Sequence, residues 1–185
     1  MRQIIILLSA LFTLNICLAE ETIKNDKVRQ GFMFGISAGA GPMILKEADN
    51  DSENYTRILF PNFQFGWMLS PRTALFLYIP TGLFERNDEQ RAFEASMPAL
   101  KYWVDEKFWV LGGIGVHMDF PLIGTDGEGF YTGPAFCAGA GYEIGRYKSC
   151  VIDLSTRYQY GRADIPDIGT RSMSGFDLLL GFSWY

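Results

Sequence analysis

The C-terminal stretch, Met173 to Tyr185, constrains the fold more than any other part of the sequence. Bulky apolar residues alternate there with small or polar ones. The apolar series is Phe176, Leu178, Leu180, Phe182 and Trp184, and the other series is Gly175, Asp177, Leu179, Gly181 and Ser183. Because successive side chains of a β-strand point to opposite faces, this alternation predicts a strand. We expect it to close a sheet into a barrel, with its apolar face toward lipid and its other face toward the lumen.

Seven further segments have the composition or the alternation of strands. They are Gly31–Ile44, Leu59–Leu69, Thr73–Leu83, Phe93–Val104, Lys107–Asp119, Phe130–Ile144 and Ser149–Tyr160. In the second segment, Leu59, Phe63, Phe65, Trp67 and Leu69 are assigned to the apolar face. The third is almost continuously apolar, so its facing is left open.

The connections between these segments alternate in length along the chain. Long polar segments are Lys46–Tyr55, Phe84–Arg91, Pro121–Glu128 and Gly161–Arg171, and short turns are Ser70–Arg72, Asp105–Glu106 and Gly145–Lys148. Long loops on one rim and short turns on the other are typical of outer-membrane barrels. The prediction is an all-β protein, an eight-stranded antiparallel up-and-down transmembrane β-barrel, with both termini on the periplasmic side.

Residues 1–19 have the pattern of a signal peptide. Arg2 supplies the positive start, Ile4 to Leu14 the apolar core, and Cys17-Leu18-Ala19 a cleavage site before Glu20. We therefore expect a mature N-terminus at Glu20, a periplasmic tail over residues 20–30 and the barrel over residues 31–185. No later apolar run reaches the roughly 18 residues of a spanning helix.

Charge and cysteine content narrow the possibilities further. The formal net charge is -5 and no basic stripe is present, which argues against a nucleic-acid partner. Cys17 would leave with the signal peptide, so Cys137 and Cys150 remain. Their predicted strands are adjacent but the side chains face opposite ways, which disulfide geometry does not allow. Both are expected to stay free, with Cys150 toward lipid.

Charged and polar residues occur on the predicted inward faces. They are Lys101, His117, Asp119, Glu143, Asp153, Arg157 and Asp177. We interpret them as a structural lumen polar cluster, because side chains fill the interior of an eight-stranded barrel. Arg157 and Asp177 fall at similar heights on neighbouring strands, and we expect them to form a buried ion pair.

His117 and Asp119 are the only histidine–acid arrangement in the sequence. Outer-membrane barrel lipases carry a His-x-Ser arrangement on one strand, but the residue two after His117 is Asp119. We therefore predict that the protein is not an enzyme. With one histidine and no paired cysteines at ligand spacing, we also expect neither a metal nor another cofactor.

Several segments resemble the small outer-membrane protein β-barrel family of the OmpA/OmpX type. They are FGISAGAG, ALKYWVDEKFWVLGGIGVHM, GPAFCAGAGYEIGRYKSCVIDLSTRYQYG and the aromatic end GFSWY. The resemblance implies a Gram-negative cell envelope, location in the outer membrane and recognition by the barrel-insertion machinery. One departure is that Trp184, and not the last residue Tyr185, belongs to the outward series.

The expected function is a structural or surface-interaction role for a monomer surrounded by outer-membrane lipids, displaying four longer loops outside. The alternatives are a narrow pore or an outer-membrane lipid-modifying enzyme. A soluble lipocalin-like ligand-binding barrel fits less well. It would have to place Asp153, Arg157 and Asp177 outside and fill its interior with Phe and Trp.

Overall fold

The structure, a computed structural model, describes residues 29–47, 52–86, 89–122, 129–165 and 169–185. These residues form antiparallel strands. The strands are β1 (Gly31–Glu47), β2 (Glu53–Ser70), β3 (Thr73–Ile79), β4 (Thr81–Arg86), β5 (Glu89–Trp103), β6 (Phe108–Pro121), β7 (Tyr131–Tyr147), β8 (Cys150–Ile165) and β9 (Gly169–Trp184). The described residues include no helix that is long and apolar enough to cross a membrane.

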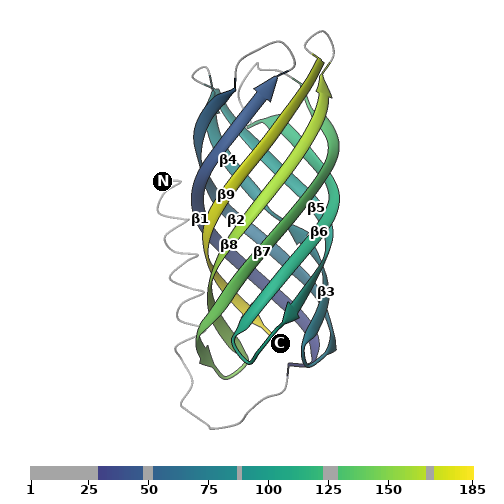
Figure 1. The fold of residues 1–185 in the computed structure, drawn as a ribbon, viewed down its shortest axis with the longest axis vertical. Coiled ribbons are helices and arrows are strands. Elements are labelled where there is room, and N and C mark those ends of the chain that lie inside the picture. The colour runs from purple at the N-terminus through teal and green to yellow at the C-terminus, as the bar shows by residue number, and fades with distance from the viewer. Residues whose placement is uncertain (1–28, 48–51, 87–88, 123–128, 166–168) are drawn as a thin grey trace.

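The strands form one closed ring, drawn in Figure 1 as a tall barrel. Strands that follow one another in sequence pair, except β3 and β4, and β1 pairs with β9 to complete the circle. The short strands β3 and β4 both pair with β2 and β5, so together they occupy one place in the ring. The ring therefore has eight positions, and the predicted eight-stranded antiparallel barrel is confirmed.

Pro80 separates β3 from β4, because proline has no N–H to donate to a neighbouring strand. The side chain of Asn62 compensates for the interruption. Its Oδ1 atom accepts a hydrogen bond from the backbone N–H of Thr81 at 3.1 Å, and its Nδ2 atom donates to the carbonyl of Ser37 at 3.0 Å. One amide thus satisfies backbone groups on both sides of the irregularity.

The distribution of side chains is inverted relative to a water-soluble protein. Trp67 and Ile114 on the outer face are 62% and 72% exposed, whereas Arg157 and Asp177 in the interior are 1% and 2% exposed. A continuous exposed apolar surface of this kind is stable against lipid and not against water. A soluble ligand-binding barrel would have the opposite arrangement.

The side of the barrel wall to which each side chain points was predicted correctly along most strands, but the assignment of Leu59 to the outer face is wrong. Leu59 is fully buried in the interior. Ser37 pairs with Asn62 whereas Gly39 pairs with Leu59, so Phe60 and Pro61 together lie opposite a single residue of β1. This bulge reverses the alternation, because one additional residue exchanges the two faces of a strand.

Three of the four predicted loops, Lys46–Tyr55, Phe84–Arg91 and Gly161–Arg171, are longer than the observed connections, because the strands continue into them. The connections on that rim are residues 48–52, 87–88, 122–130 and 166–168. Much of each predicted loop is polar, yet Glu47, Arg91 and Arg171 lie in strands and are buried. Charged residues point into a polar lumen, so a charged segment at a barrel rim does not by itself mark a loop.

The opposite rim carries short turns at Ser70–Thr73, Trp103–Phe108 and Tyr147–Cys150. In the second of these turns, Asp105 accepts hydrogen bonds from the backbone N–H groups of Phe108 and Lys107, which lowers the pKa of Asp105. The C-terminus lies at this rim (Figure 1), and Arg29, the first described residue, contacts Tyr185 there. The predicted signal peptide, residues 1–19, and residues 20–28 of the predicted tail lie outside the described residues.

The cysteine prediction is half right. Cys137 is buried and free, and it does not pair with Cys150. Cys150 is 3% exposed and disulfide-bonded, so the predicted free thiol toward lipid is wrong. Alternation does not apply at this first residue of β8, where Cys150 and Val151 are both buried.

Candidate functional site

The interior of the barrel is the one place where the described chain concentrates buried charge. Every residue of the predicted lumen polar cluster is buried: Lys101, His117, Asp119, Glu143, Asp153, Arg157 and Asp177. Four further buried charged residues complete the cluster and were not predicted to be there. They are Glu47, Arg57, Arg91 and Arg171.

The centre of the interior is built around Asp177 on β9. Arg157 on β8 is its register partner, and the Nη2 atom of Arg157 lies 2.7 Å from Oδ2 of Asp177, as predicted. Arg57 lies on β2, the other neighbour of β1, and donates to both carboxylate oxygens, at 2.9 and 2.8 Å. The second terminal nitrogen of Arg157 donates to the hydroxyl of Tyr78. One carboxylate thus holds two guanidinium groups in place.

A second group of charges lies nearer the rim with the longer connections. Arg171 donates to Glu47 at 2.8 and 2.6 Å through Nε and Nη2, and to Asp119 at 2.8 Å through Nη1. Arg91 also donates to Asp119, at 3.1 and 2.9 Å. The Nη1 atom of Arg86 lies 3.0 Å from Glu47. This alternating chain of acids and arginines crosses the lumen.

The end of the interior at the rim with the short turns is closed by contacts of Glu143. Its Oε1 atom accepts hydrogen bonds from Nε1 of Trp103 and from the hydroxyl of Tyr185, both at 2.7 Å. Arg29 donates to the same carboxylate at 3.0 Å, and its guanidinium lies 4.6 Å from the centroid of the Trp103 ring. Burial and the neighbouring negative charge raise the pKa of Tyr185, so its hydroxyl stays protonated and can donate.

Lys101 occupies an aromatic environment a short distance inside this end. It is 1% exposed, and its Nζ atom lies 3.9 Å from the ring centroid of Trp109 and 5.1 Å from that of Trp103. Both distances are typical of cation–π contacts, which compensate part of the cost of removing an ammonium group from water. The interior therefore stabilises this cation with rings as well as with carboxylates.

His117 forms no hydrogen bond with Asp119. Its ring is fully buried and stacks on Phe93 with a centroid distance of 4.4 Å, and it packs against Gly161. Neither ring nitrogen has a hydrogen-bond partner among the described residues. Asp119, the acid two residues later, is instead bound by the two arginines on the rim side. The His117–Asp119 spacing thus places both residues inside the barrel without bringing them together.

Two apolar clusters fill much of the remaining interior. The larger is formed by Met33, Ala74, Phe76, Tyr78, Ala95, Met97, Ala99, Trp103, Trp109, Leu111, Ala135 and Cys137. The smaller is formed by Met43, Leu45, Phe84, Phe93 and Met173. Within the described chain, no group of three or more His, Cys, Asp or Glu side chains is arranged to hold a metal ion. The interior has the character of a packed, charge-paired core.

Sequence reasoning missed Arg57 because the bulge beside Leu59 was not recognised. It missed Arg91 and Arg171 because charged segments were interpreted as loops. A usable signal was present, since Arg171, Met173, Gly175 and Asp177 continue the inward series at period two.

A closed antiparallel ring with an apolar outer face and a charge-paired interior defines a transmembrane β-barrel of the small outer-membrane type. Known structures agree with this class. The chain is similar to Ail, the attachment invasion locus protein of Yersinia pestis, with a TM-score of 0.58, 16% identity, and coverage of 84% of this chain and 99% of that chain. It is also similar to Neisserial surface protein A, with a TM-score of 0.52, 13% identity, and coverage of 82% and 96%.

These identities are low, so the likeness concerns the fold. No family model matches the chain, and no curated protein matches its sequence. The fold agrees with the resemblance that the sequence motifs suggested and with the predicted location in an outer membrane.

Proposed function

We propose that this protein is an integral outer-membrane barrel with a structural or surface-interaction role, and that it is neither a pore nor an enzyme. The observation that carries the proposal is the paired interior, in which Asp177 holds Arg57 and Arg157 while Arg171 links Glu47 to Asp119. Opening a path through the lumen would require separating buried ion pairs, which is energetically costly. A barrel built in this way serves best as a rigid support for its outer rim.

Planar-bilayer conductance tests this proposal against a pore. The refolded barrel is expected to give no steady conductance. The variant Asp177→Ala removes the acid that holds the two central arginines. Where this variant still folds, its conductance provides a matched comparison with that of the unmodified protein. Steady ion flow through the unmodified protein would contradict the proposal.

The proposal against an enzyme rests on His117. A general base needs a hydrogen bond to the proton it removes and access to a substrate. His117 is fully buried and stacked on Phe93. Release of fatty acid from lipid vesicles that contain the protein is expected to be absent, and the same low rate is expected for His117→Ala. Hydrolysis that depends on His117 would contradict this part of the proposal.

The composition of the outer connections supports a preference for cationic surfaces. Residues 48–52, 87–88, 122–130 and 166–168 contain no lysine or arginine. Their acidic residues are Asp49, Asp51, Asp88, Asp126, Glu128 and Asp167. Ail has been crystallised with the heparin analogue sucrose octasulfate. These acidic connections repel such a polyanion, so a partner that binds them should carry the opposite charge.

A cell-binding assay tests this charge preference. It compares how intact cells with and without the protein bind to polylysine-coated and heparin-coated beads. The protein is expected to increase binding to polylysine, with a decrease at high salt because the interaction is electrostatic. Increased binding to heparin would contradict it.

A further inference from the structure

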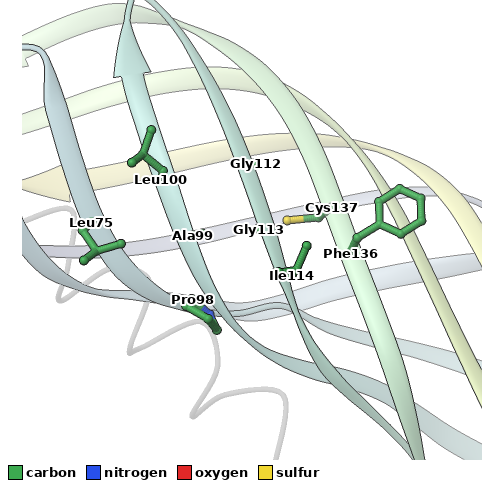
Figure 2. Close-up of a pocket in the computed structure, with 9 residues that line it drawn as sticks. All are labelled: Leu75, Pro98, Ala99, Leu100, Gly112, Gly113, Ile114, Phe136 and Cys137. Carbon is green, nitrogen blue, oxygen red and sulfur yellow. The ribbon is translucent and has the colours of Figure 1, made fainter.

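Two adjoining grooves lie on the outer face of the barrel, over β5, β6 and β7. The first has a volume of about 600 Å³ and is drawn in Figure 2. Its lining residues are Leu75, Pro98, Ala99, Leu100, Gly112, Gly113, Ile114, Phe136 and Cys137. The second has a volume of about 750 Å³ and shares Pro98, Ile114 and Phe136 with the first. The two volumes therefore form one elongated depression in the lipid-facing surface.

The depression exists because small residues occupy outward positions among large ones. Gly112 has no side chain, and a Cβ atom built there would meet only the carbonyl oxygen of Cys137, at 3.9 Å. The rings of Pro98 and Pro134 lie close to the backbone. Leu100 and Ile114 beside Gly112 are 46% and 72% exposed and stand above it as walls. The outer face here has a fixed shape instead of an even apolar surface.

Arg162 on β8 lies at one end of the second groove, next to Tyr160. It is close to the end of β8 at the rim with the longer connections. Its side chain is 52% exposed. Among the described residues, its Nη2 atom makes two contacts, 3.2 Å to Oγ1 of Thr170 and 3.5 Å to Oδ1 of Asp164. The remaining N–H groups of the guanidinium have no acceptor among these residues and are available to an anion.

A second cation is aligned with Arg162 across the neighbouring strands. Arg162 pairs with Ser172 on β9, and Ser172 pairs with Lys46 on β1. Lys46 is exposed. Beside the groove, the rim therefore presents a row of Arg162, Ser172 and Lys46, in which a hydroxyl lies between two cations. Basic side chains at a membrane surface attract phosphate groups of lipids.

We propose that this groove binds one anionic lipid of the surrounding membrane, with an acyl chain in the depression and its phosphate on Arg162. The groove faces hydrocarbon, so an acyl chain can enter without crossing water. Its two volumes lie within the range of roughly 300–1,000 Å³ that specific small-molecule sites occupy. The guanidinium at the rim end matches the phosphate by charge and by geometry, since arginine recognises phosphate through paired hydrogen bonds.

Native mass spectrometry of the protein released from nanodiscs tests the proposal. The probes are phosphatidylglycerol, which is anionic, and phosphatidylcholine, which is not, with identical acyl chains. The unmodified protein should retain phosphatidylglycerol in preference to phosphatidylcholine. The change Arg162→Gln should lower that preference by about fivefold, the effect of one basic side chain at a lipid surface. Equal retention of the two lipids by the unmodified protein would overturn the proposal.

The change Gly112→Leu tests the groove separately from the charge. Leucine fits at this position because little lies within reach of a Cβ atom, and it would fill the depression. Retention of both lipids should then fall. Gly145→Leu is a matched control, because a Cβ at Gly145 would meet only Ile152 at 3.9 Å and the site is not part of either groove. Unchanged lipid retention in Gly112→Leu, or a dimer of the unmodified protein that this change dissociates, would refute lipid as the occupant.

Discussion

The Nε and Nη2 atoms of Arg57 donate to the two carboxylate oxygens of Asp177, at 2.9 and 2.8 Å, inside the barrel. Both side chains are fully buried. The contact joins β2 to β9, which do not pair with each other as strands. It therefore ties together the two strands on either side of β1, in addition to the backbone hydrogen bonds that run around the ring.

Removing the charge of Asp177 should be strongly destabilising. Asp177→Asn leaves Arg57 and Arg157 as two buried guanidinium groups without their shared anion. Loss of one partner from a buried ion pair costs about 3–5 kcal/mol. Urea titration of the barrel folded into lipid vesicles should show a loss of this size in the free energy of unfolding.

The matched control is Asp164→Asn, which removes the same charge from an aspartate on the outer face of β8. The Asp164 side chain is 80% exposed, and its contact with Arg162 is 3.5 Å long. Exposed ion pairs contribute about 0–1 kcal/mol. Similar losses for the two variants would show that the central cluster is not the source of stability we assign to it.

His117 should be dispensable for folding. Its ring nitrogens have no partner among the described residues, while Phe93 stacks on its face. A buried polar group without a partner costs about 1–3 kcal/mol, whereas an apolar group of similar shape costs nothing of this kind. We expect His117→Leu to be at least as stable as the unmodified protein in urea titration. A loss of stability would indicate that the ring nitrogens are satisfied by groups such as ordered water.

The alkaline stability of the barrel should depend on Tyr185. Its hydroxyl donates to Glu143 at 2.7 Å, and burial together with that carboxylate raises the pKa of Tyr185. The pKa is about 10 in the unfolded chain, so the stabilisation is complete below this pH and is lost as the pH rises above it. A hydrogen bond to a charged group contributes about 1.5–3 kcal/mol.

The change Tyr185→Phe keeps the ring and removes the hydroxyl. At pH 8 the variant should be less stable than the unmodified protein in urea titration. At pH 11 the difference between the two should be smaller, because the unmodified protein then loses the contribution of its hydroxyl. A difference that does not change with pH would contradict a role for this proton.

The sequence predicted the ring and most of its facing because alternation records which side of a strand is buried. The same signal failed at Leu59, because a bulge there changes the alternation and Pro61 is its only marker in the sequence. It was also overridden at Arg91 and Arg171, where charge was interpreted as exposure. In a membrane barrel the interior is the polar side. Charged residues at every second position can therefore belong to a strand that points them into the lumen, and they do not by themselves indicate a loop. The approach of Arg57 to Asp177 could not be predicted, since the unrecognised bulge beside Leu59 decides that Arg57 faces the interior.

The orientation of the barrel wall is tested most directly at the adjacent residues Leu180 and Gly181. Leu180 is 43% exposed on the outer face, whereas a Cβ atom at Gly181 would lie 2.9 Å from both carboxylate oxygens of Asp153 in the interior. Leu180→Arg should cost about 2–4 kcal/mol, the penalty for a cation near the membrane midplane. Leu180→Phe should be nearly silent, because lipid adapts to its shape.

Gly181→Phe should destabilise the folded barrel, because it forces a ring into a packed interior beside a buried carboxylate. Folding of the three variants into lipid vesicles, followed by urea titration, gives the comparison. A water-soluble barrel predicts the reverse order, with Leu180 in the core and Gly181 open to solvent. If Leu180→Arg folds as well as the unmodified protein while Leu180→Phe does not, the outer face of β9 does not meet hydrocarbon and the membrane-barrel assignment is wrong.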